Sequence, residues 1–132
     1  MTRNVGYAVF AAAALVLMAS GPRGQAVAPT LSKDVQPIFD EGCDCHQGSN
    51  ARAKLDLTAG KSYASLVNQP SIQVATMMRV KAGDPDASYL MVKLDHKNTV
   101  GKGMPKSFFG STSLSPKDLE TIRAWIREGA QP

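Results

Sequence analysis

The chain has few aromatic side chains and few cysteines and histidines. Aromatic residues make up 6% of the 132 positions, and the chain has two cysteines and two histidines. With so few large apolar side chains, we expect something other than side-chain packing to fill the centre of the domain. A structural zinc site normally takes four ligands. Because no second cluster of cysteine and histidine accompanies the first, zinc is a disfavoured alternative.

Long hydrophobic runs are absent apart from one near the N-terminus. Residues 5–19 are uncharged and rich in alanine, follow Arg3, and are broken by Gly21 and Pro22. This order predicts a secretory signal peptide at residues 1–26. A run of about 15 residues is short for a membrane span, which needs about 20, and a retained membrane anchor is the alternative. We expect an exported, periplasmic protein with one domain at 27–132, which touches a membrane only if the signal segment is retained.

Strong positive charge is also lacking in the expected mature domain. Loss of Arg3 and Arg23 with the signal lowers the net charge from +4 to about +2. Nucleic-acid binding usually requires a stronger and more clustered basic charge. We therefore expect no nucleic-acid partner.

Strand-like alternation is not convincing anywhere, whereas several segments have helical signals. Val35, Ile38 and Phe39 recur at helical spacing before Gly42, and Thr30 and Ser32 are cap candidates. A short helix is expected from a cap at Thr58 to about residue 67, and another after the turn at 83–86. Residues 74–81 are ambiguous. The sequence predicts an all-α domain of about four short helices.

The final helix has the clearest signals. Ser115 is a cap, Pro116 is the first helical residue, Asp118 completes a capping-box pattern, and Gly129 ends the helix. We expect one face of this helix to pack on the first helix near Phe39. That face consists of Leu119, Ile122, Trp125 and Ile126.

The segment that carries chemistry is Cys43-Asp44-Cys45-His46. Two cysteines immediately before a histidine are typical of c-type haem attachment, in which thioether bonds hold the porphyrin and the imidazole ligates the iron. The usual spacer has two residues, and here it has one. Because each helical residue turns the chain by about 100°, a regular helix would point Cys43 and Cys45 in opposite directions. Either the backbone breaks near Gly42, or only Cys45 is bonded.

Other uses of the two thiols are a redox pair or a disulfide. A bridge between Cys43 and Cys45 would be strained, and it would close too small a loop to restrict the unfolded chain. Export normally favours disulfides, but this spacing favours chemistry over a structural bridge.

From Asp34 to Ala130 the chain resembles a family of small bacterial monohaem cytochrome c-like domains. The matching segments occur in the family's order, and Met104-Pro105 is one of them. The others are Asp34-Val35-Gln36-Pro37-Ile38-Phe39, Leu55-Asp56-Leu57-Thr58, Gly83-Asp84-Pro85, Ser88-Tyr89-Leu90, Leu114-Ser115 and Trp125-Ile126-Arg127-Glu128-Gly129-Ala130. The resemblance implies a cytochrome c-like fold of about four helices around one covalent haem c. It also implies electron transfer rather than enzymatic activity, with His46 and Met104 as axial iron ligands.

Met104 also stands out from its surroundings, because it lies in a polar, glycine-flanked loop with no core to fill. Met77, Met78 and Met91 have helical neighbours and are expected to pack, although one of the pair Met77 and Met78 could replace Met104. His96 is expected on the surface, with a bis-histidine site as its alternative.

A redox partner protein is the partner that this assignment requires, and no small-molecule substrate is expected. Lys97, Lys102 and Lys106 flank the proposed ligand loop. They are either ordinary solvated charges or a basic collar that steers an acidic partner surface. Two further classes stay open: a peroxidase-like haem enzyme with a labile distal site, and a non-haem binding or structural domain that has lost cofactor attachment.

Overall fold

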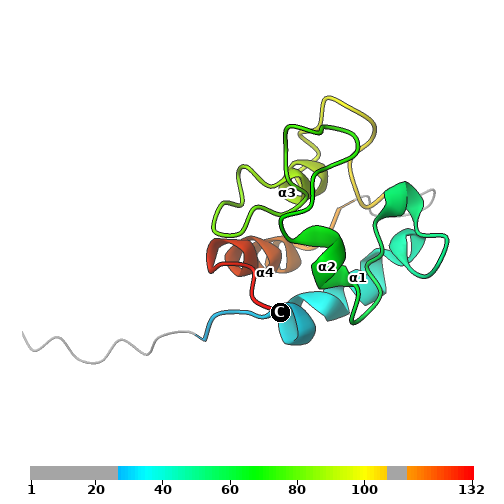
Figure 1. Cartoon of the computed structure of the whole chain (residues 1–132). Helices are drawn as coiled ribbons and strands as arrows, with labels where there is room; N and C mark the ends of the chain where they lie inside the picture. Colours follow the sequence, from blue (N-terminus) through cyan, green and yellow to red (C-terminus); the bar gives the residue numbers. More distant parts are fainter. Residues whose placement is uncertain (1–26, 107–112) are drawn as a thin grey trace, which may run out of the picture.

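The computed structural model describes residues 27–106 and 113–132, so the predicted signal peptide at 1–26 lies outside the described residues. Four α-helices are present, α1 (Gln36–Gly42), α2 (Ser62–Leu66), α3 (Tyr89–Leu94) and α4 (Pro116–Arg127) (Figure 1). Short 3-10 turns occur at Asp44–His46 and Arg52–Lys54. The described part of the chain contains isolated β-bridges but no strand. The prediction of an all-α domain with four short helices is confirmed.

The chain enters the first helix through a π-helical turn at Leu31–Val35, which the sequence did not predict. Thr30 is the N-cap residue of this turn, but its side chain makes no capping hydrogen bond. Instead, the backbone N–H of Thr30 donates to Oδ2 of Asp34 at 2.8 Å. The predicted apolar stripe is present, because Val35 and Phe39 are fully buried and Ile38 packs against them.

Helix α2 begins later in the chain than predicted. The N-cap residue of α2 is Lys61 and not Thr58. Thr58 instead accepts backbone hydrogen bonds from Lys61 and Ser62 in a turn that precedes the helix, and its hydroxyl accepts from Gly48 N–H at 2.9 Å. The ambiguous segment 74–81 is a loop whose isolated β-bridges join Val67 to Val80 and Met78 to Ser88.

The last helix follows the prediction closely. The Ser115 hydroxyl oxygen accepts a hydrogen bond from Asp118 N–H at 3.1 Å and donates to the Asp118 carboxylate at 2.7 Å. Ile122, Trp125 and Ile126 are fully buried, and α4 packs against the π-helical turn. Trp125 belongs to the same core as Phe39, whereas Leu119 of the predicted face is only half-buried.

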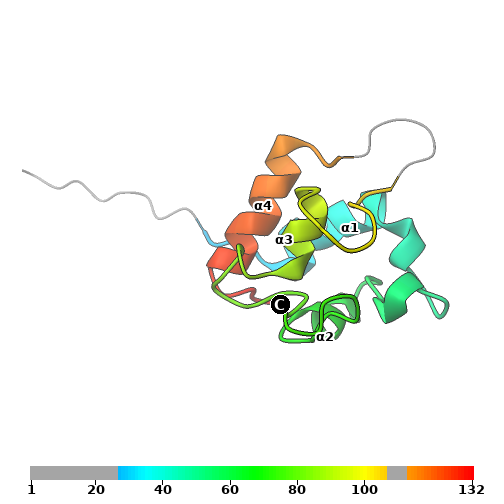
Figure 2. The same cartoon turned by 90° about the horizontal axis from the view of Figure 1, so that it is seen from above.

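Helices α3 and α4 lie side by side, with α1 and α2 around them (Figures 1 and 2). The first and last described segments meet, since Leu31 N–H donates to the carbonyl of Gln131 at 2.9 Å. No helix within residues 27–106 and 113–132 combines the length and apolar character needed to cross a membrane.

Candidate functional site

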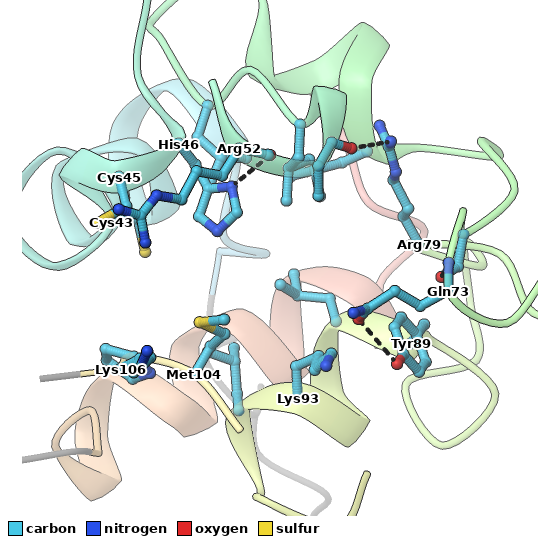
Figure 3. A pocket seen from close by; sticks show the side chains of 18 of the residues that line it. Cys43, Cys45, His46, Arg52, Gln73, Arg79, Tyr89, Lys93, Met104 and Lys106 are labelled. Atoms are coloured by element: carbon cyan, nitrogen blue, oxygen red, sulfur yellow. Dashed lines mark hydrogen bonds between the residues drawn. The ribbon is translucent and has the colours of Figure 1, made fainter. Parts of the chain in front are cut away.

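The structure contains a cavity of about 260 Å³ that is lined by all four predicted site residues, Cys43, Cys45, His46 and Met104 (Figure 3). This volume is just below the range of about 300–1,000 Å³ that is typical of ligand sites. Five leucines contribute to the apolar part of its wall: Leu55, Leu57, Leu66, Leu90 and Leu94.

The backbone breaks where the cysteines begin. Helix α1 ends at Gly42, and Cys43 has φ −130° and ψ 31°, outside the helical region. The chain then tightens into the 3-10 turn Asp44–His46, closed by a 2.9 Å hydrogen bond from His46 N–H to the Cys43 carbonyl. This change of conformation places both thiols on the cavity wall despite the one-residue spacer. Desolvation, together with the negative charges near it, raises the pKa of Cys43 to about 11, so its thiol is protonated at neutral pH.

His46 is held by a backbone carbonyl on one side and faces the cavity with the other. Its Nδ1 lies 3.0 Å from the carbonyl oxygen of Arg52. Desolvation lowers the pKa of His46, and the hydrogen bond to Arg52 offsets this only in part, so the ring is neutral at neutral pH. A carbonyl oxygen only accepts, so Nδ1 carries the proton and Nε2 keeps its lone pair. This is how proteins orient an imidazole that ligates a metal.

The turn that carries this carbonyl is itself supported by an arginine. Ala53 and Lys54 follow Arg52 with φ of 58° and 51°, a left-handed conformation that is strained for non-glycine residues. Arg79 donates hydrogen bonds to the carbonyls of both Ala53 and Lys54 at 3.2 Å, and to that of Ser65 at 2.7 Å. Arg79 therefore holds the turn that orients His46.

Met104 lies on the opposite wall of the cavity from His46, and its sulfur faces the imidazole (Figure 3). The backbone N–H of Met104 donates to the carbonyl of Lys93 in α3 at 2.9 Å. The methionine is half-buried, and its side chain lines the cavity with Pro105 and Lys106. A nitrogen with a free lone pair and a thioether sulfur thus face each other across one apolar space.

The other methionines and His96 lie elsewhere. Met91 is buried in the core, as expected, whereas Met78 is 40% exposed, so its predicted packing role is wrong. Neither these two nor Met77 lines the cavity. His96 is exposed, and its ring lies so close to Gly103 that a Cβ there would collide with it. His96 does not line the cavity either.

The cavity wall also carries several positive charges, and of these only Lys106 was singled out from the sequence. Arg52, Arg79, Lys93 and Lys106 all line it, against a single acidic residue, Asp44. A lysine at position 93, inside the apolar run 89–94, was the one available signal. No sequence signal pointed to Arg79, because the residues that it contacts lie about 25 positions away in the sequence.

Within the described ranges, no three His, Cys, Asp or Glu side chains gather in a group that could hold a metal ion. Comparisons with known protein families, with curated proteins and with solved structures found no match to this chain.

Proposed function

We propose that this chain is an exported electron-transfer protein that carries one covalently attached haem c, with His46 and Met104 as its axial ligands. The observation that carries the proposal is the opposed pair in Figure 3, in which the His46 ring and the Met104 sulfur face each other across one apolar cavity. The hydrogen bond from Nδ1 to the Arg52 carbonyl supports the role of His46, since it leaves Nε2 free.

The lining of the cavity supports an apolar cofactor that bears carboxylate groups. Leucines line the cavity, and the side chain of Arg52 supplies positive charge on its wall. Burial of apolar surface would contribute binding free energy at about 25 cal/mol per Å², and the Arg52 guanidinium would pair with a carboxylate.

The positions of the two cysteines support covalent attachment. Cys43 is half-buried, Cys45 is exposed, and both line the cavity next to His46. Each thioether forms when a thiol S–H adds across a vinyl group of the porphyrin, so sulfur bonds to carbon and the proton is retained on the adduct. The break in the helix at Cys43 supports the alternative in which both thiols are bonded despite the one-residue spacer.

When bound, the haem supplies a one-electron iron couple, and methionine ligation raises its reduction potential. The chain's own residues would occupy both axial positions and leave none for a substrate. This supports electron transfer over peroxidase-like activity. The exposed side chains of Lys97, Lys102 and Lys106 lie on the segment around Met104 and suit a redox partner with an acidic surface.

The test is a pyridine haemochrome spectrum and an intact mass of the full chain, expressed in a periplasm together with haem-maturation machinery. We expect the spectrum of haem c and a mass that includes one haem. A colourless protein without added mass would overturn the proposal in favour of a non-haem domain. Rapid cyanide binding by the oxidised protein would show an open axial site and favour an enzyme.

A further inference from the structure

Lys93 is buried although it carries a charge. Its side chain belongs to α3, with a relative exposure of 8%, and lines the cavity beside Met104 (Figure 3). Buried ammonium groups are costly unless hydrogen bonds satisfy them. The contacts of Lys93 therefore show what its burial achieves.

All the hydrogen bonds of Lys93 to the following loop converge on residues 100–104. Its Nζ donates to the carbonyl of Val100 at 3.0 Å and to that of Lys102 at 2.9 Å. Its own carbonyl accepts the hydrogen bond from Met104 N–H at 2.9 Å. One residue thus holds alternate positions of the loop, and the last of them is the proposed iron ligand.

Tyr89, one helical turn before Lys93, strengthens this arrangement. Its hydroxyl lies 3.4 Å from the Val100 carbonyl, which Lys93 also contacts. The Lys93 ammonium lies 5.4 Å from the centroid of the Tyr89 ring, within the range of a cation–π interaction. In the described part of the chain, no carboxylate forms an ion pair with Lys93. Its donors are directed at the loop.

We propose that Lys93 is a positioning residue that holds residues 100–104 against α3 and so keeps the Met104 thioether on the cavity wall opposite His46. The inference rests on the proposed function for the role of Met104. The loop contains Gly101 and Gly103, and ordering its residues costs backbone entropy. Without the hydrogen bonds of Lys93, the loop would leave the wall more often.

The test compares Lys93→Met with the parent and with Lys97→Met. Methionine keeps an unbranched apolar stem and removes the ammonium. Lys97 is exposed, and the hydrogen bond of its ammonium is with Asp95 at 3.4 Å, so its replacement is a matched control. Lys93→Arg restores a charged donor. Should Lys93→Met fail to accumulate, Lys93→Gln, which keeps a neutral donor, takes its place.

Two measurements decide the role. In Lys93→Met we expect amide hydrogen exchange at Met104 to be at least about tenfold faster, with the amides of α4 unchanged, and the Met-to-iron charge-transfer band to weaken. Lys97→Met should match the parent, and Lys93→Arg should recover part of both signals. Parent-like exchange at Met104 and a parent-like band in Lys93→Met would overturn the inference. Because exchange needs no haem, it tests the loop even if the parent proves colourless, which would refute only the proposed function.

Discussion

Arg123 of α4 donates hydrogen bonds to both carboxylate oxygens of Asp95, at 3.0 and 2.8 Å, and so joins the end of α3 to α4. Both side chains are mostly buried, with exposures of 24% and 17%. Because α3 also carries Lys93 and the backbone contact to Met104, this ion pair connects the stability of the fold to the position of the cavity wall.

This ion pair predicts a pH dependence of stability. Burial acts to raise the pKa of Asp95, but the hydrogen bonds and charge of Arg123 outweigh it and lower the pKa. A lowered pKa in the folded state means that the pair stabilises the fold fully above about pH 4, the ordinary value for Asp. The contribution is lost as the pH falls through the lower folded value.

Arg123→Gln should therefore lower the free energy of unfolding by about 1.5–3 kcal/mol at pH 7. The difference from the parent should shrink below about pH 4, as measured by denaturant unfolding at several pH values. Arg127→Gln is the control, because its pair with Glu120 is exposed and should be worth less than about 1 kcal/mol. A difference that stays constant down to pH 2 would contradict the assignment.

His46→Ala should abolish a stable low-spin haem spectrum, because it removes the only imidazole that faces the cavity. The measurement is the visible spectrum of the oxidised and reduced protein. His96→Ala is the matched control, since His96 is exposed and does not line the cavity. An unchanged spectrum in His46→Ala would refute the assignment of the proximal ligand.

Met104→Ala should remove the Met-to-iron charge-transfer band, and Met104→His should keep the iron low-spin but lower the reduction potential. Spectroscopy and redox titration measure these changes. Met78→Ala, at an exposed methionine outside the cavity, should leave both unchanged. If the band survives in Met104→Ala, another ligand must replace Met104.

Covalent attachment of haem should depend more strongly on Cys45 than on Cys43. Cys45 adjoins His46, so the turn that directs the imidazole into the cavity also brings this thiol to its edge. We expect Cys45→Ser to lose covalent haem and Cys43→Ser to keep one thioether, as read from intact mass and thiol alkylation. Retention in Cys45→Ser together with loss in Cys43→Ser would reverse this order.

Trp125→Ala should destabilise the fold by about 3–5 kcal/mol, the usual cost of truncating a buried tryptophan. The side chain is fully buried, and its indole N–H donates to the Gln131 carbonyl at 2.7 Å. Thermal unfolding measures the loss. Tyr63→Ala, at a residue that is 38% exposed, should have a smaller effect. A Trp125→Ala variant that melts within a degree or two of the parent would refute the packing.

The sequence was informative where local signals decide the structure. Helix α4 follows from a cap, a proline and an apolar face within 15 residues, and the four candidate site residues follow from one short motif and one Met-Pro pair. The π-helical turn at Leu31–Val35 and the start of α2 were not predicted, because backbone hydrogen bonding there does not follow from residue type.

The parts of the site that support its ligands depend on distant contacts. Arg79 stabilises the turn at Ala53 and Lys54 from a segment that has no clear periodicity. The carbonyl of Arg52 is a main-chain group that any residue could provide, so no side chain marks it. Lys93 breaks an apolar run, but its role becomes clear only when the loop at 100–104 folds over it.

The hydrogen bond between Leu31 and Gln131 means that the chain comes into the domain and leaves it at the same place. The domain could therefore be inserted into a surface loop of another protein, because its two ends would fit between neighbouring residues of that loop. A domain inserted in this way would be tethered twice, so it could not swing freely as it would on one linker. Two tethers would restrict which face of the domain meets a partner on the host protein.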